Sequence, residues 1–125
     1  MSNENKKITT KPILTIKGQN LGLDKNHGPI GLWVYDTAFK RSLTDDLIRA
    51  IDPSRQEIDA LLLYRLIYVM SGINERISFI DLLQEIPKTN NILMHRETIL
   101  DKASDVYLPM ESQEVESKDK KETND

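Results

Sequence analysis

The sequence predicts a mostly α-helical α+β protein in which an N-terminal β-hairpin is followed by four or five helices and a disordered acidic C-terminal tail. Apolar residues alternate with polar ones near the N-terminus, which is the period of a strand, whereas later segments repeat apolar residues at helical spacing. The last fifteen residues contain only one strongly apolar residue, Val115, and carry the whole net charge of −3. Such a tail cannot bury enough apolar surface to offset the cost of ordering it.

The chain has 125 residues, which is enough for a single domain. Residues 111–125 hold six acidic and three basic residues, whereas residues 1–110 hold fourteen of each sign. We therefore expect a flexible arm over residues 1–11, one hairpin-plus-helices domain over 12–110, and a disordered acidic tail over 111–125. The neutral body argues against nucleic-acid binding, which needs clustered Lys and Arg. No apolar run approaches the roughly 20 residues that span a bilayer, so we expect no membrane partner.

Residues 12–24 are predicted to form the hairpin. Leu14 and Ile16 alternate with polar residues before the predicted turn over residues 17–20, and Leu21 and Leu23 do so after it. All four apolar side chains would lie on one face of the hairpin. Because an isolated two-stranded sheet is marginal in water, that face must pack on helices or on another chain.

Residues 29–39 are compatible with a buried strand or with a helix. We favour a helix, because Pro29 suits a first helical position and because Leu32, Tyr35 and Phe39 recur at helical spacing. Capping residues, prolines and glycines delimit the other helices. These signals predict helices over 43–51 after Ser42, over 53–71 between Pro53 and Gly72, over 79–86 between Ser78 and Pro87, and over 92–105.

Residues 60–70 are apolar or tyrosine at every position except Arg65. A helix that is apolar nearly all round must be buried on several sides, either as the central helix of one monomer or with the help of a partner chain. Arg65 itself fits a surface arginine with a buried stem or an inter-chain ion pair that sets register. The aromatic residues are core residues or anchors of an interface. The candidate partner-binding or self-association residues are Leu62, Tyr64, Arg65, Leu66, Tyr68, Val69, Trp33 and Tyr35.

No pattern of residues predicts catalysis, a cofactor or a metal. His27 and His95 each lack a second histidine three or four residues away. The adjacent Asp45 and Asp46 suit a helix N-terminus better than an acid–base pair. Neither a phosphate-binding loop nor a dinucleotide-binding fingerprint is present. We therefore expect a protein that is not an enzyme.

The order of these features resembles the small tail assembly chaperones of tailed phages that infect Gram-positive hosts. The resemblance covers about residues 13–108. It is carried by the following segments: Leu14-Thr15-Ile16-Lys17-Gly18, Gly28-Pro29, the aromatic segment through Tyr35 and Phe39, Asp46-Leu47-Ile48, Leu63-Tyr64-Arg65-Leu66-Ile67-Tyr68-Val69-Met70 and Phe79-Ile80-Asp81-Leu82-Leu83. Where such proteins often carry a tryptophan before the Leu-Asp of the short helix, this chain has Phe79-Ile80-Asp81.

The resemblance implies a non-enzymatic protein that binds the phage tape-measure protein before tail-tube subunits polymerise around it. It also implies self-association into a homo-oligomer, and a longer frameshifted form that recruits the tail tube protein. Such chaperones act in the host cytoplasm and are not retained in the mature virion. An alternative is a small DNA-binding regulator with a helix-turn-helix around residues 43–71, prompted by the short connection at Asp52-Pro53. The acidic residues that crowd this region argue against it.

Overall fold

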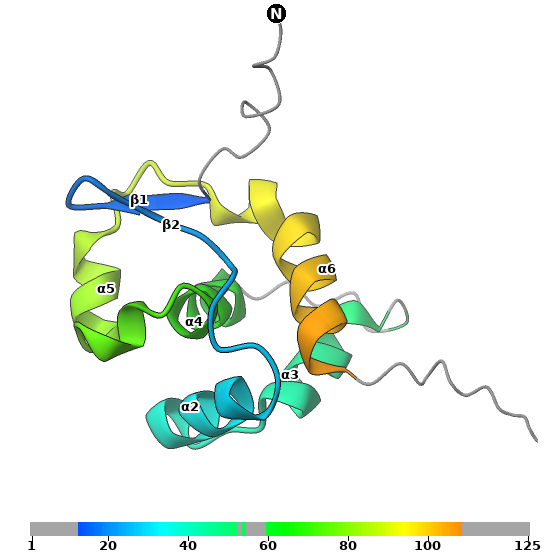
Figure 1. Ribbon diagram of the computed structural model, residues 1–125. Coiled ribbons are helices and arrows are strands. Elements are labelled where there is room, and N and C mark those ends of the chain that lie inside the picture. Colours follow the sequence, from blue (N-terminus) through cyan, green and yellow to red (C-terminus); the bar gives the residue numbers. More distant parts are fainter. Residues whose placement is uncertain (1–12, 53, 55–59, 109–125) are drawn as a thin grey trace, which may run out of the picture.

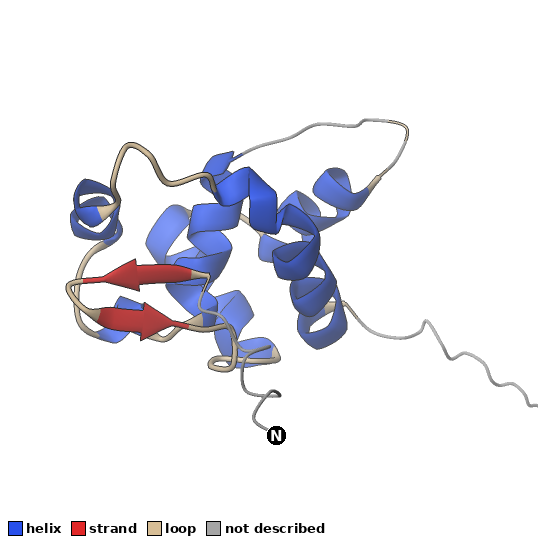
Figure 2. Ribbon diagram, turned by 90° about the horizontal axis from the view of Figure 1, so that it is seen from above, coloured by secondary structure: helices blue, strands red, loops and turns tan. Residues whose placement is uncertain are grey.

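The computed structural model describes residues 13–52, 54 and 60–108, and it confirms the predicted class (Figures 1 and 2). The predicted arm (residues 1–11) and the predicted acidic tail (residues 111–125) lie outside the described residues. The described elements are the strands β1 (Leu14–Ile16) and β2 (Gln19–Leu21), the α-helices α2 (Pro29–Phe39), α3 (Leu43–Ile51), α4 (Ala60–Met70), α5 (Phe79–Glu85) and α6 (Arg96–Tyr107), and the 3₁₀ turns η1 (Ile73–Glu75) and η2 (Ile92–His95).

The hairpin has a tighter turn than the sequence predicted. Lys17 and Gly18 both have positive φ, 50° and 77°, which is the signature of a two-residue turn that matches the twist of the strands. The strands are antiparallel, with Leu14 opposite Leu21 and residue 16 opposite residue 19. Residues 19 and 20 therefore belong to β2 and not to the turn. Leu14, Ile16 and Leu21 are buried as expected, and Leu23 lies beyond the strand, half-buried against the core.

The capping signals in the sequence locate the helix starts correctly. The Ser42 hydroxyl accepts a hydrogen bond from the Asp45 N–H at 3.2 Å, and the Ser78 hydroxyl accepts one from the Asp81 N–H at 3.2 Å. Residues 29–39 are helical, with Pro29 in the first turn.

Two predicted helices differ in part from the helices of the structure. Of the predicted helix over 53–71, residues 60–70 form α4, and residues 53 and 55–59 lie outside the described residues. Gly72 follows α4 with a positive φ of 79°. The predicted helix over 92–105 begins as the 3₁₀ turn η2 and continues as α6 to Tyr107.

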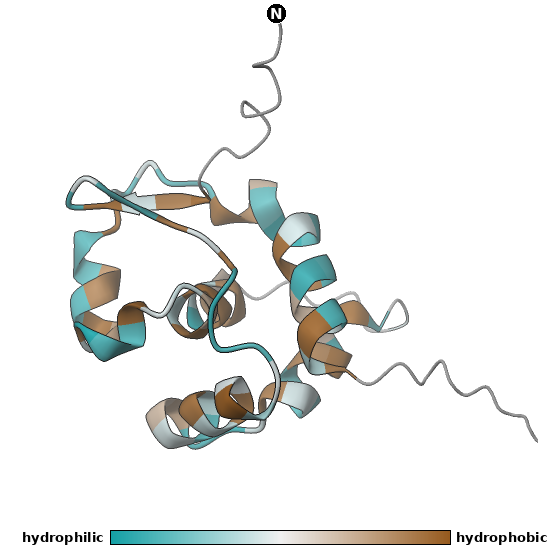
Figure 3. Cartoon of the chain, viewed as in Figure 1, coloured by the Kyte–Doolittle hydropathy of each residue, from teal (hydrophilic) through white to brown (hydrophobic). Residues whose placement is uncertain are grey.

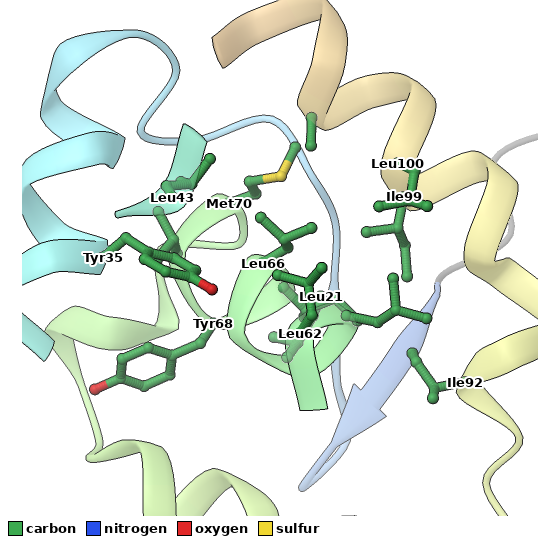
Figure 4. Close-up of a cluster of buried hydrophobic side chains, with 14 of the residues drawn as sticks. Leu21, Tyr35, Leu43, Leu62, Leu66, Tyr68, Met70, Ile92, Ile99 and Leu100 are labelled. Atoms are coloured by element: carbon green, nitrogen blue, oxygen red, sulfur yellow. The ribbon is translucent and has the colours of Figure 1, made fainter. Parts of the chain in front are cut away.

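The centre of the fold is α4. It packs on α2, α5, α6, η1 and η2, and the hairpin covers one side of the helices (Figures 1 and 2). Side chains from β2, α2, α3, η2 and α6 belong to the same buried cluster as those of α4 (Figure 4). The structure thus supports the interpretation of α4 as the central core helix of one monomer, and no partner chain is needed to cover it.

Candidate protein-binding surface

Four of the predicted partner-binding residues are core residues of this chain. Leu62, Leu66, Tyr68 and Val69 are all buried along α4, where Figure 4 shows the first three among side chains of other elements. The Tyr68 hydroxyl donates to the Ile77 carbonyl oxygen at 2.8 Å. Folding of the chain itself covers these four residues, which places them in its core and not on an exposed surface.

Tyr64 is half-buried on the same helix. Its hydroxyl oxygen accepts a hydrogen bond from the Asn90 side-chain amide at 2.8 Å. This bond ties the segment before η2 to the first half of α4. Tyr64 thus has a role within the fold and does not provide an open anchor.

Tyr35 and Arg65, two further predicted contact residues, meet inside the protein at the buried carboxylate of Asp46. The Tyr35 hydroxyl donates to Asp46 Oδ2 at 2.7 Å, and Arg65 Nε donates to the Tyr35 hydroxyl oxygen at 2.9 Å. Arg65 Nη2 lies 3.8 Å from Asp46 Oδ2. The Arg65 guanidinium also lies 5.8 Å from the centre of the Phe39 ring, within the range of a cation–π contact. Arg65 is therefore neither a surface arginine nor part of an inter-chain pair, because its partner belongs to its own chain.

Two arginines complete this cluster from the surface side. Arg41 donates to Asp46 from Nε at 2.7 Å and from Nη2 at 2.8 Å, and Arg49 Nη2 donates at 2.6 Å. Burial raises the pKa of Asp46, but the hydrogen bonds from Arg41 and Tyr35 outweigh this effect and hold the pKa below its usual value of 3.8. Burial raises the pKa of Tyr35 well above its ordinary value of 10. At neutral pH the cluster is a carboxylate held by protonated donors, and it joins α2, α3 and α4.

Trp33 is the one predicted contact residue that the structure leaves open to a partner. Its side chain is 63% exposed, and Ile30 on the same face of α2 is 50% exposed. The opposite face of this helix carries the buried Tyr35, and the buried Val34 lies one turn beyond Ile30. We call the pair Ile30 and Trp33 the α2 apolar face. Figure 3 colours the backbone of α2 by hydropathy, with both apolar and polar segments along the helix. Aromatic and aliphatic side chains side by side on one helix are typical anchors of protein interfaces.

A second set of exposed apolar residues lies where α3, α4 and η2 come together. The Arg96 guanidinium donates to the Ala50 carbonyl oxygen at 3.1 Å, which brings the start of α6 to the end of α3, and η2 packs on α4. Ile51, Leu61, Leu93 and Met94 from these segments are all exposed. Ile48 on α3 and Ile80 on α5 are exposed as well. Exposed apolar side chains are therefore present, but apart from Leu61 they lie on the elements around α4 and not on α4 itself.

Among the described residues, no group of three or more His, Asp or Glu side chains could hold a metal ion. His27 Nε2 lies 2.9 Å from the Leu23 carbonyl oxygen, a local loop contact. In the part of the chain that the structure describes, no helix combines the length and the apolar character needed to cross a bilayer.

Comparisons with models of known protein families, with curated proteins and with solved structures found no match to this chain. The functional argument therefore depends on the residues themselves. The signal for the α2 apolar face was present in the sequence, since the spacing of Leu32, Tyr35 and Phe39 defines a buried face that leaves Ile30 and Trp33 outside. Nothing in the sequence pointed to Leu61, Leu93 or Met94.

Proposed function

We propose that this chain is a non-enzymatic tail assembly chaperone that binds and solubilises the tape-measure protein of a phage during tail morphogenesis. It would act in the host cytoplasm and be absent from the mature virion. The proposal is supported by the order of sequence elements that resembles these chaperones. The single observation that carries it is the α2 apolar face, where Trp33 is 63% exposed beside Ile30 although most of the core helix α4 is already covered.

The physical task of such a chaperone is to cover apolar helical segments that would otherwise aggregate. An amphipathic helix of the client can lie against the α2 apolar face, with Trp33 inserted between its side chains, as in other helix-in-groove complexes. Each contact of this size is weak, but many copies along one long client gain from high effective concentration. The net charge of −3 in residues 111–125 would keep the coated complex in solution.

Two further partners belong to the same proposal. The chain would self-associate into a homo-oligomer, which brings several α2 apolar faces to one client. A longer frameshifted form would recruit the tail tube protein through its extension. The coding DNA tests this second point, since a slippery run under Lys120-Lys121 and an open second frame are required.

The alternative of a DNA-binding regulator receives no support from a particular contact or surface. A helix-turn-helix protein needs an exposed recognition helix, whereas α4, the second helix of the region 43–71, is enclosed by the rest of the fold. A shift assay at low salt separates the two functions, because a chaperone retards no DNA duplex.

Trp33 is the only tryptophan of the chain, so its fluorescence reports directly on the proposed contact. The purified protein is titrated with a fragment of the long helical protein encoded beside it. We expect a blue shift of the emission as Trp33 leaves water, together with co-sedimentation of the two proteins. Trp33→Ala should abolish or strongly weaken co-sedimentation.

Ile80→Ala is the matched control, because Ile80 is as exposed as Trp33, 63%, but lies on α5. It should leave binding unchanged. Binding that survives Trp33→Ala would show that the α2 apolar face is not the contact. A protein that ignores the fragment in sedimentation and in fluorescence would overturn the proposed function.

A further inference from the structure

The outer edge of β2 carries backbone groups that no other strand of the described residues satisfies. The sheet has only two strands, and the two-residue turn makes the pair of residues 16 and 19 a hydrogen-bonded pair. The next pair along the hairpin, Thr15 and Asn20, is then a non-hydrogen-bonded pair. The side-chain bond of 2.9 Å between Thr15 Oγ1 and Asn20 Oδ1 agrees with this close spacing. The backbone N–H and C=O of Asn20 therefore point away from β1, toward the free edge.

A hollow of about 410 Å³ lies along this edge. One side is formed by residues 19, 20 and 22, the other by residues 71–73, 75 and 76, and the loop residues 24–26 complete it. An extended polypeptide added to a free sheet edge gains main-chain hydrogen bonds. Because the segment 71–76 stands opposite β2, the hollow suits a single extended segment better than the sheet of a second folded body.

The lining of the hollow favours a polar occupant, and its charged residues are two acidic and two basic side chains. Nearly all of its residues are polar, which disfavours an apolar client segment. Asp24 and Glu75 line it and form no ion pair with other described residues. Of the two cationic side chains there, Arg76 donates to Gln19 Oε1 at 2.5 Å, and the carbon atoms of Lys25 lie against Gly72.

The chain itself contains a segment with these properties. Residues 6–11 read Lys-Lys-Ile-Thr-Thr-Lys, in which three consecutive β-branched residues favour an extended backbone. Because side chains alternate along a strand, Lys7 and Lys11 share one face and can meet Asp24 and Glu75. This segment precedes β1, on the opposite edge of the hairpin from the hollow. To pair with β2 of its own chain it would have to cross the sheet, whereas the same segment of a second copy meets no such obstacle.

We propose that the free edge of β2 is a strand-acceptor site that binds residues 6–11 of a second copy of this chain. The eight residues from Lys6 to Ile13 span about 26–29 Å when extended, and reciprocal donation closes a two-fold dimer. The site lies apart from the α2 apolar face, so it joins copies of the protein while that face stays available. It deepens the self-association included in the proposed function by naming its contact, and the observations behind it are independent of the α2 apolar face.

Proline substitutions in the full-length chain test this site without touching the folded core. Consecutive N–H groups of a strand point to opposite edges, so either Ile8→Pro or Thr9→Pro removes a donor from the added strand. Asn3→Pro, outside the segment, is the control. We expect sedimentation velocity to give a dimer for the wild type and for Asn3→Pro, and a monomer for at least one of the other two variants. Trp33→Ala should remain dimeric, which separates this contact from the α2 apolar face.

Amide hydrogen exchange measured by NMR reports on the edge itself. In the wild-type dimer the Asn20 amide should exchange at least about tenfold more slowly than in the monomeric proline variant. The Thr15 amide, on the opposite edge of the same hairpin, should be unaffected. A wild type that is monomeric at all concentrations, a dimer that both variants retain, or an Asn20 amide whose exchange rate is unchanged by dimerisation would each overturn the proposal. Protection of Asn20 in a monomer would also overturn it, since the occupant would not come from a second copy.

Discussion

Replacing Asp46 with Asn tests whether the buried carboxylate holds the three helices α2, α3 and α4 together. The substitution keeps the size of the side chain but removes its charge, and it puts an amide group where guanidinium and hydroxyl donors converge. Tyr35, Arg41 and Arg49 all donate to this carboxylate at 2.6–2.8 Å. Arg65, buried beside it, would lose the carboxylate 3.8 Å away.

The expected loss follows from how exposed each partner is. The side chains of Arg41 and Arg49 are 47% and 41% exposed, so water can replace the lost partner and each pair contributes only about 0–1 kcal/mol. The bond from Tyr35 is buried, and a hydrogen bond to a charged group is worth about 1.5–3 kcal/mol. Breaking a buried ion pair on one side costs about 3–5 kcal/mol in other proteins. We expect Asp46→Asn to lower the free energy of unfolding by about 3–5 kcal/mol, a large part of the total for a domain of this size.

Urea unfolding followed by far-UV circular dichroism at pH 7 measures this loss. The Trp33 fluorescence is a poor probe here, because Trp33 is exposed in the folded state. Asp45→Asn is the matched control, since it makes the same charge change at the neighbouring exposed position, where the helix dipole contributes only about 0.3–1 kcal/mol. If the two variants differ by less than about 1 kcal/mol, the buried cluster does not stabilise the fold as argued.

The same cluster predicts a defined pH dependence. Because the pKa of Asp46 is lower in the folded chain than its usual 3.8, the unfolded chain takes up this proton first as the pH falls. The stability that the ionised carboxylate provides is therefore complete above about pH 5 and is lost as the pH falls below 4. The difference between wild type and Asp46→Asn should be constant from pH 7 to 5 and should shrink below pH 4. A difference that stays constant down to pH 2 would contradict the lowered pKa.

Three further predictions concern packing and titration. Gly31→Ala should cost about 1–3 kcal/mol in urea unfolding, because a Cβ atom there would collide with the Asn26 carbonyl oxygen and the Tyr107 ring, whereas Gly22→Ala, which meets only ordinary contacts, should cost much less. Burial raises the pKa of Tyr107 to about 12, so the folded chain holds this proton after the unfolded chain has lost it near pH 10; stability should fall between pH 10 and 12, and Tyr107→Phe should remove this part of the alkaline loss. Leu66→Ala should cost about 2–5 kcal/mol, whereas Trp33→Lys should change the free energy of unfolding by less than about 0.5 kcal/mol; equal losses would contradict their assignment to core and surface.

The element boundaries were predictable because they depend on local chemistry. Ser42 and Ser78 cap helices through their own hydroxyls, Pro29 begins α2, and Gly72 takes the left-handed conformation after α4. Each of these signals acts between residues that are close together in the chain, so it can be recognised from a single sequence. The two-residue turn was missed because Lys17 takes a positive φ, which is uncommon for a side chain other than Gly, Asn or Asp.

The environment of Arg65 was not predictable in the same way. Its partners Tyr35 and Asp46 lie 30 and 19 residues away along the chain, and the approach of α2 and α3 to α4 is set by tertiary packing. Asp46 looked like one of two helix-terminus acids, and only the structure separates it from the exposed Asp45. A single charge in an otherwise apolar helix does indicate a buried partner, but it does not say which acid supplies it.

Because most of α4 is buried, a binding surface made of apolar side chains has to be looked for on the helices around it. A small domain is not expected to bury a helix that is apolar nearly all round. Here three helices, two 3₁₀ turns and a hairpin pack around most of it. Each helix that packs one face on α4 has its other face exposed to water. On α2 that outer face carries Ile30 and Trp33 beside the exposed Asp36 and Thr37, so the two apolar side chains there are a property of the sequence that core packing does not require. We propose that α2 binds another polypeptide through this face, and comparison of Trp33→Ala with Ile80→Ala decides whether it does.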